Sequence, residues 1–265
     1  MEALLLKLPA LVTALWWPFC RCLALLSAAP VLGEAMLPVT IRVLLALALA
    51  LAVILMPVAA HNAVAIDPFS LHGLAATFEQ AVIGVAIGLA LQLSMAAIQT
   101  AGFVLSSQMG LSMAVMNDPL NGSSSDAVSN LLFILCTLVF FSVDGHLVIT
   151  GIVGASFQAW PVGGGFANLS FDTLALNVAW IFSAAMLLAL PMVFSSLVVQ
   201  IGFGFLNRVA PSLNLYALGF SVVTLFGVMM LVLLAPTFPA HYLQMSERVL
   251  DMLQHGLNSA GAGRG

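Results

Sequence analysis

The sequence predicts an all-α membrane protein built from about six long apolar helices, and two observations carry this prediction. Of the 265 residues, 62% are hydrophobic and only 6% are charged. A soluble domain carries about 25% charged residues and fewer than half apolar ones, so no soluble fold could cover this much apolar surface. The apolar residues also gather in long runs, and a helix needs roughly 20 such residues to cross the core of a bilayer.

The apolar runs give the expected helices in chain order. They cover residues 8–32, 40–60, 78–105, 128–157, 174–206 and 212–236. The third, fourth and fifth runs are longer than one crossing requires, so we expect them to tilt, to kink or to continue outside the bilayer. Prolines should supply the breaks and the ends, because proline lacks the amide hydrogen that a helix interior needs. The prolines concerned are Pro9, Pro18, Pro30, Pro191 and Pro236.

The two ends of the chain carry weaker signals. Residues 241–257, HYLQMSERVLDMLQHGL, place leucine and valine at helical spacing among polar residues, which predicts a short amphipathic helix. The residues after it, NSAGAGRG, are expected to form a disordered tail. Near the start, Lys7 and the apolar run after it are similar to a signal peptide, but Arg21 interrupts that run, so we expect a retained helix.

Few charges are available to orient the helices. With about six crossings, Arg42 and Arg208 fall on one side of the membrane, while Asp67 and Asp172 fall on the other. The positive-inside rule then places the two arginines in the cytoplasm and both termini outside. The expected cytoplasmic turn between the last two long helices contains Asn207, Arg208, Pro211 and Asn214.

Several functional classes find no support in the sequence. The formal charge of −4 is spread over few groups and no Lys/Arg cluster occurs, so nucleic-acid binding is excluded. Cys20, Cys22 and Cys136 are odd in number and lack CxxC spacing, so no metal site, cofactor or disulfide is expected. No nucleophile elbow, zinc-protease motif, phosphate-binding loop or dinucleotide-binding pattern is present, so the chain is not expected to be an enzyme.

Asp144 and His146 flank Gly145 inside the fourth apolar run. An unpaired polar group in hydrocarbon costs several kcal/mol, so these side chains need a partner or a function. One interpretation is a proton relay. The other is a local carboxylate–imidazole pair at a helix kink that Gly145 permits. No second intramembrane acid lies nearby in the sequence, so we favour the structural role.

Glutamines form a row along the third apolar run. Gln92 and Gln99 are seven residues apart and share one face of a helix, and Gln108 continues the series. Such a row lines a watery path or makes hydrogen bonds between helices, and we favour hydrogen bonding. Gly84 and Gly88 form a GxxxG motif on the same run, which suits close contact with another helix.

Residues 106–126, SSQMGLSMAVMNDPLNGSSSD, interrupt the apolar chain at its middle. Gly110, Pro119 and Gly122 favour turns, and the methionines supply flexible apolar bulk. By itself this pattern fits either an ordinary connector or a segment with a function of its own.

Three separated motifs of this chain resemble the FliR family and occur in the same order. The first begins at Glu79 and reaches QMGLS at 108–112, followed by a DP pair. The second is DGHL at 144–147, and the clearest is NRVAPSLNLYALGF at 207–220. The resemblance spans about residues 79–220. Together the three motifs are specific, although each one alone is weak.

The resemblance implies a place in the export gate of flagellar type III secretion, with related proteins in virulence injectisomes. It implies one FliR-like subunit in a hetero-oligomeric ring of FliP-like and FliQ-like subunits. A FlhB-like export component and unfolded flagellar proteins in transit would be further partners, and residues 207–214 would contact another export component. The implied location is the bacterial inner membrane at the flagellar basal body, partly above the bilayer plane toward the periplasm.

The resemblance also implies a division of the chain. Residues 1–173 would form a FliP-like helical part that includes the 106–126 loop, and residues 174–240 a FliQ-like helical hairpin. Residues 241–265 would form the amphipathic helix and the tail. In such a complex some apolar runs are buried in protein rather than in lipid, and both environments select the same residues.

Site residues follow from the same resemblance. The 106–126 segment would lie inside the conduit and help to block it. The residues expected in this plug are Gln108, Met109, Gly110, Met113, Met116, Asp118 and Pro119. We expect aromatic residues in many relatives where this chain has Met113 and Met116, so the side chain that narrows the conduit is left open. The polar residues expected to be buried in structural roles are Glu79, Gln92, Gln99, Asp144 and His146.

The sequence therefore predicts a subunit of the flagellar type III export gate that helps to form and close the conduit for unfolded flagellar proteins. The alternative is a proton-coupled secondary transporter or an ion channel that uses Asp144 and His146. Purification separates the two, because a transporter comes out alone while a gate subunit co-purifies with small hydrophobic partners.

Overall fold

The computed structural model describes residues 2–33, 37–55, 66–111, 116–118, 123–165, 171–209 and 215–262. The regular secondary structure of this part of the chain is helical apart from one short hairpin of two strands. It divides into two compact units that interleave along the sequence. The first unit comprises Met1–Leu93, Phe140–Ala175 and Ser246–Gly265, and the second comprises Ser94–Val139 and Leu176–Met245.

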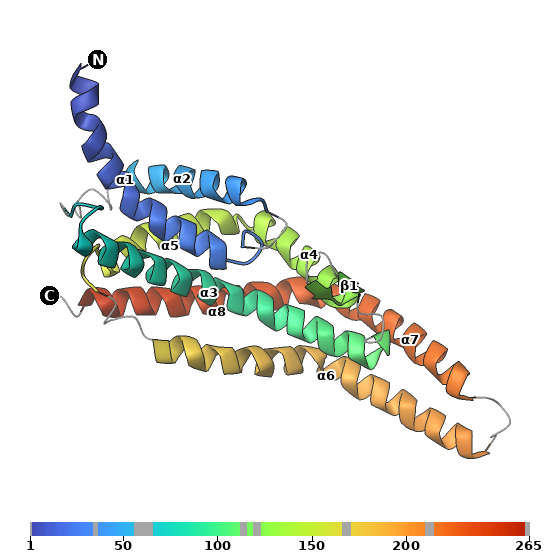
Figure 1. Cartoon of the computed structure of the whole chain (residues 1–265). Coiled ribbons are helices and arrows are strands. Elements are labelled where there is room, and N and C mark those ends of the chain that lie inside the picture. Colours follow the sequence, from blue (N-terminus) through green and yellow to red (C-terminus); the bar gives the residue numbers. More distant parts are fainter. Residues whose placement is uncertain are drawn as a thin grey trace. The chain divides into compact units, whose positions relative to one another are not determined.

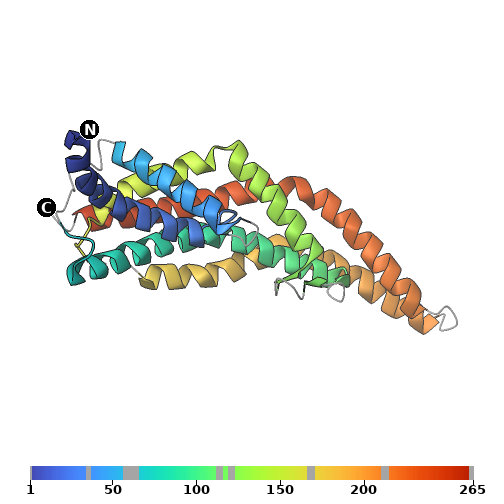
Figure 2. The same ribbon diagram turned by 45° about the horizontal axis from the view of Figure 1, so that its top comes forward.

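The first unit is built around α1 (Glu2–Ala28) and the first part of α3 (Leu71–Gln108). The helices α2 (Val39–Leu55) and α5 (Gly145–Ala159) and the last part of α8 (Phe238–Ala262) complete it. In both Figure 1 and Figure 2, α2 lies alongside α1. The buried core of this unit includes Trp17, Leu25, Ile83, Val153 and Phe157.

Two glycines let α1 and α3 approach until their backbones touch. A Cβ atom at Gly84 would overlap the carbonyl oxygen of Arg21, and one at Gly88 would lie 2.6 Å from the carbonyl oxygen of Leu25. No other residue type fits at such distances without moving the backbone. The close helix contact predicted from the GxxxG motif is therefore confirmed.

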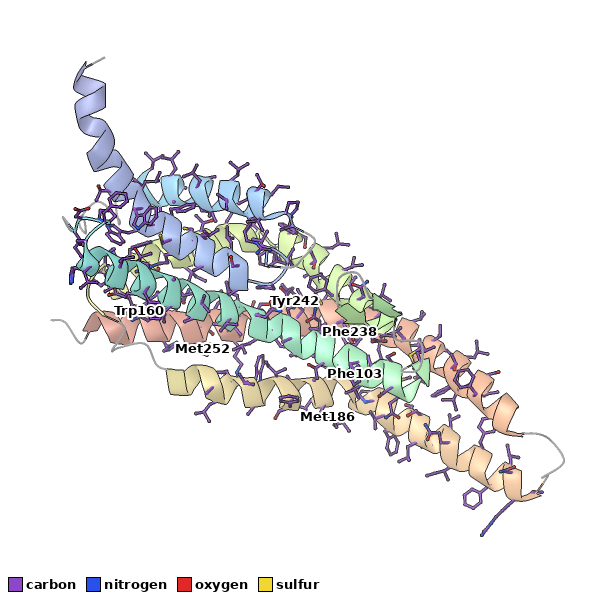
Figure 3. The ribbon with its side chains drawn as sticks, in the orientation of Figure 1. Phe103, Trp160, Met186, Phe238, Tyr242 and Met252 are labelled. Atoms are coloured by element: carbon purple, nitrogen blue, oxygen red, sulfur yellow. The ribbon has the colours of Figure 1, made fainter. Side chains whose placement is uncertain are left out.

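The second unit contains the end of α3, the hairpin strands, most of α4 (Ala127–Ser142) and the long helices α6 (Phe171–Val209) and α7 (Leu215–Leu234). The helix α7 runs alongside the second half of α6 (Figures 1 and 2). A short 3₁₀ turn, η2 (Ala235–Thr237), joins α7 to the start of α8. Phe238 and Tyr242 come from the first turns of α8 (Figure 3), and both side chains are buried.

Fewer helices than expected could cross a bilayer by their own length. Within the described residues, three helices are long and apolar enough, at Leu71–Gln108, Ala175–Val209 and Gly219–His255. The count rises to four if α4 and α5 form one broken span, because the chain bends by 70° between them. The fourth apolar run was predicted as one helix that tilts or kinks, and it is two helices because Asp144 leaves the helical conformation (φ 55°).

Prolines end helices less often than the sequence suggested. Pro30 follows the end of α1, and Pro236 lies in η2 directly after α7, as predicted. Pro9, Pro18 and Pro191 lie inside α1 and α6, which continue through them, so the predicted breaks at these positions are wrong. A proline removes one backbone hydrogen bond, and the surrounding helix turns can hold the helix together around that loss.

The amphipathic helix predicted at 241–257 lies within the longer α8. That helix continues to Ala262. It therefore includes residues 258–262, which were predicted to belong to a disordered tail, and the prediction is wrong for them.

Candidate functional site

The polar segment at mid-chain joins the end of α3 to the start of α4. After Gly110, strand β1 (Met116–Asp118) pairs antiparallel with β2 (Ser123–Ser125), with Met116 opposite Ser125. Met113 and Pro119, both expected in the plug, lie outside the described residues. The hairpin was missed from the sequence, although an Asn-Gly pair at 121–122 is a common hairpin signal.

The last residues of α3 are bonded to α6 and α7. The hydroxyl of Ser196 on α6 lies 2.9 Å from Gln108 Oε1 and 2.9 Å from the carbonyl oxygen of Val193, so its one proton is shared between two acceptors. The hydroxyl of Thr224 on α7 donates to the carbonyl oxygen of Met109 at 3.0 Å. Gln108 and Met109 are therefore tied to two different helices of the same unit.

Apolar packing holds the same point. The side chain of Met109 is buried, and a Cβ atom at Gly227 on α7 would overlap its Cγ. The same Cβ would lie 3.0 Å from Cε of Met192 on α6. Met109 therefore fills a notch that exists because residue 227 has no side chain.

Gly110 ends α3 in the left-handed conformation, with φ 73°. Its amide donates back to the carbonyl oxygen of Ser107 at 3.2 Å, a capping arrangement that favours glycine because other residues are strained there. A Cβ on Gly110 would lie 3.0 Å from the ring of Phe220 on α7. Gly110 thus both turns the chain out of the helix and packs against α7.

The returning arm of the segment is fixed by an N-terminal cap on α4. Asp126 Oδ2 accepts hydrogen bonds from the amide of Ser129 at 2.9 Å and from its hydroxyl at 2.8 Å. The same hydroxyl also lies 3.0 Å from the carbonyl oxygen of Gln99 on α3. A Cβ at Gly102 would lie 2.6 Å from Cα of Ser129, so α3 and α4 touch here. Asp126 was not singled out from the sequence, although an aspartate directly before an apolar run is a helix-start signal.

The glutamine row divides into different environments. Gln108 makes the predicted hydrogen bond between helices, to Ser196. Gln99 is half-buried and offers its backbone carbonyl to Ser129. Within the described part of the chain, the buried Oε1 atom of Gln92 has no hydrogen-bond partner, so the prediction of a bonded row does not hold there.

Asp144 and His146 are not buried in this chain. Both side chains are exposed, and among the described residues no hydrogen bond joins the carboxylate to the imidazole. The ring of His146 lies 6.1 Å from that of Phe141. In this chain the structure shows neither burial of the two side chains nor a bond between them, so their structural role stays a prediction. The predicted bend itself is confirmed, and these positions offer no chain of buried proton acceptors.

Sequence reasoning missed a buried arginine in the first unit. Arg21 is fully buried, and its Nε donates to Gln80 Oε1 at 2.9 Å. One terminal nitrogen of Arg21 donates to the hydroxyl of Ser156 at 2.9 Å. The other donates to the carbonyl oxygen of Trp160, labelled in Figure 3, at 2.7 Å. The guanidinium carbon also lies 3.8 Å from the ring centre of Phe157. These contacts join α1, α3 and α5 through one side chain.

Glu79 supplies the negative charge of this network through Gln80. The amide nitrogen of Gln80 donates to Glu79 Oε1 at 3.2 Å, and the backbone amide of Gly165 donates to Oε2 at 3.1 Å. Glu79 is buried, as predicted. The signal for the network was present, because an arginine interrupts one apolar run and a glutamate another, but the sequence does not show which runs are neighbours.

Asn207 and Arg208 lie at the exposed end of α6. Pro211 and Asn214, the other residues predicted for this turn, lie outside the described residues. Within the ranges that the structure describes, no group of three or more His, Cys, Asp or Glu side chains could hold a metal ion.

Comparison with known proteins gives one consistent result. Residues 12–249 match the family described as "Bacterial export proteins, family 1". The chain is 35% identical over 243 residues to the flagellar biosynthetic protein FliR of Pectobacterium carotovorum, an alignment that covers 91% of this chain and 92% of the relative. It is 31% identical over 239 residues to FliR of Escherichia coli K12, which covers 90% of each chain. It is also 27% identical over 176 residues to the Yop proteins translocation protein T of Yersinia pestis, which covers 65% of this chain and 67% of the relative.

Proposed function

Because this chain belongs to the FliR family of bacterial export proteins, we propose that it helps to form and to close the conduit of the flagellar export apparatus. The family is one of export-apparatus components and not of enzymes. It is related to the Yop proteins translocation protein T of Yersinia pestis. The proposal concerns what this component does within the apparatus, and the segment 106–126 is the element that we assign to closure.

The observation that carries the proposal is how this segment is held. Its first residues are fixed by Ser196 and Thr224, and its last residue, Asp126, caps α4. The chain between these two points includes the short hairpin β1–β2, in which the described strands pair over three residues each. A conduit wide enough for an unfolded chain also passes ions and water, so it needs a seal that yields to cargo. Methionine suits a compliant seal because its side chain is flexible and apolar.

Exposed apolar surface supports the assignment to a larger assembly in a membrane. The span in α3 is 61% buried by the chain itself, whereas the spans in α6 and in α7–α8 are only 28% and 6% buried. Apolar helices that the chain leaves uncovered must meet lipid or other subunits. We place the chain in the inner membrane at the flagellar basal body, partly above the bilayer plane toward the periplasm.

The proposed partners are those of a mixed ring. FliP-like and FliQ-like subunits would cover the exposed helices, and a FlhB-like component would contact the turn at 207–214. Unfolded flagellar proteins would be the passing cargo. In this proposal residues 1–173 act as the FliP-like part, 174–240 as the FliQ-like hairpin, and 241–265 as the amphipathic end.

Deletion of the middle of the segment tests the closure role. Residues 112–122 would be removed while both anchored ends stay, in a cell that carries the complete export apparatus. We expect an assembled gate that leaks at rest, measured as a fall in inner-membrane potential with a voltage-sensitive dye. Cells without this chain control for leaks that do not pass through the gate. An assembled deletion variant with an unchanged membrane potential contradicts the closure role.

A further inference from the structure

We propose that the α6–α7 pair latches the closure segment in its resting position. The latch consists of Gln108, Met109 and Gly110 at the end of α3, with Ser196 on α6 and Thr224 and Gly227 on α7. This inference rests on the proposed closure function and adds the element that controls it. All six residues belong to the same compact unit.

The hydroxyl of Thr224 is used differently from those of four other threonines in the described helices. Thr77, Thr100, Thr137 and Thr150 each donate to the carbonyl oxygen four residues earlier in their own helix. Such a bond satisfies the hydroxyl locally and needs no neighbour. Thr224 instead donates to Met109, a residue 115 positions away in the sequence. Its hydrogen bond therefore depends on α3 and α7 staying in register.

Gly227 shows that the fit at this point is close. Other glycines of α6 and α7, Gly202, Gly204 and Gly219, have no atom within 4 Å of the position of a Cβ. Gly227 is buried, and a Cβ there would overlap Met109 and press on Met192. The absence of a side chain at 227 is therefore what allows Met109 to seat between α6 and α7.

The position of the latch couples it to the closure segment. Gly110 ends α3 in a left-handed conformation against Phe220, so the latch holds the first residues of the closure segment 106–126 and the rest of the segment follows Gly110. A displacement of α6 and α7 away from the end of α3 must break the bonds to Gln108 and Met109, or move the start of the segment with it. Displacement of the helix pair thus either releases the first residues of the segment or carries them along.

Single substitutions test the latch in the full chain within the complete apparatus. Thr224→Val keeps the side-chain shape and removes the hydroxyl, while Gly227→Ala adds the Cβ that overlaps Met109. We expect Thr224→Val to raise the resting leak about fivefold, which corresponds to the ~1 kcal/mol of a typical hydrogen bond. Gly227→Ala should raise the leak further, because it displaces Met109 itself.

Matched controls lie on the same two helices. Ser195→Ala removes a hydroxyl that donates to Pro191 in its own helix, and Gly219→Ala adds a Cβ where nothing lies within 4 Å. Neither control should change the leak. In a chain that also carries Met109→Ala, Gly227→Ala should raise the leak less than it does in the parent chain, because the overlapping Cγ atom is gone. If the two substitutions raise the leak additively, Met109 does not fill the notch at residue 227.

The outcomes separate the latch from the closure function. If the 112–122 deletion leaks while Thr224→Val and Gly227→Ala assemble and stay tight, the latch is wrong and the closure role stands. If the deletion itself stays tight, the closure role is wrong and the latch fails with it. If the Gly227→Ala variant fails to assemble, the leak of the Thr224→Val variant still tests the latch, because valine replaces threonine without a change in shape.

Discussion

At the scale of single residues, Arg21 is the most demanding feature of the chain. A buried charge is tolerated only when its donors are satisfied, and Arg21 has acceptors on Gln80, Ser156 and Trp160. Removing one partner of such a network leaves the others buried without a bond, and this costs about 3–5 kcal/mol. The contact with the ring of Phe157 is lost as well.

We therefore expect Arg21→Met to lower the stability of the chain strongly, measured as the midpoint of thermal unfolding in detergent. Met has a similar length and is apolar, so the change leaves little empty volume. Arg208→Met is the matched control, because it removes the same charge from an exposed position. Equal effects of the two substitutions would show that the network contributes nothing specific.

Single residues also show which features the sequence predicts and which it does not. Gly110 could be assigned to the end of a helix from the sequence, since glycine is favoured there. The partners Ser196 and Thr224 could not, because each looks like an ordinary small polar residue in an apolar helix. The same holds for Arg21, whose partners are 59 to 139 positions away. A pattern along one helix does not carry information about which helix lies opposite.

At the scale of elements, the bend between α4 and α5 is set by two adjacent residues. Asp144 adopts φ 55°, which side chains with a branched Cβ tolerate poorly. Gly145 lies so close to the ring of Phe140 that a Cβ would overlap it. The apolar run continues across the bend, so hydropathy alone predicted a single helix.

Substitutions at Asp144 separate the effect of backbone strain from the effect of the carboxylate charge. Asp144→Asn should leave assembly and export unchanged, because asparagine tolerates the left-handed conformation and the carboxylate makes no cap hydrogen bond. Asp144→Val should lose about 1–2 kcal/mol from the strain of that conformation. Export is measured as secreted flagellar protein and stability as the thermal midpoint. An assembled Asp144→Asn variant without export would mean that the charge itself is used, and the proton-relay interpretation would then be preferred.

At the scale of the whole molecule, composition predicted a membrane environment but not which helices the chain itself buries. The helical class and the long apolar spans followed from 62% hydrophobic residues. Composition did not show which spans are covered by the chain itself. The spans in α3 and α6 have the same mean hydropathy of 2.2, but the first is 61% buried and the second 28% buried. Lipid and protein neighbours select the same side chains, so a sequence does not distinguish them.

The orientation of the chain is open to a direct test. Arg208 is predicted to face the cytoplasm, and its neighbour Asn207 is exposed at the end of α6. A cysteine at Asn207 should react with a membrane-impermeant thiol reagent only after the inner membrane is opened. The parent chain is the control, since Cys22 and Cys136 are buried and Cys20 is partly buried. Labelling from the periplasmic side of intact membranes would reverse the orientation.

The interleaving of the two units has a consequence for synthesis on the ribosome. The first unit begins with α1 but is completed by Ser246–Gly265, and Leu250 and Leu253 from that last stretch pack against its core. The earliest helices to emerge must therefore wait, with part of their core uncovered, until translation has reached the end of the chain. A ribosome that stops after Met245 releases a product whose defect lies in the part made first. Synthesis through Ser246–Gly265 is thus a condition for completing the core of the first unit.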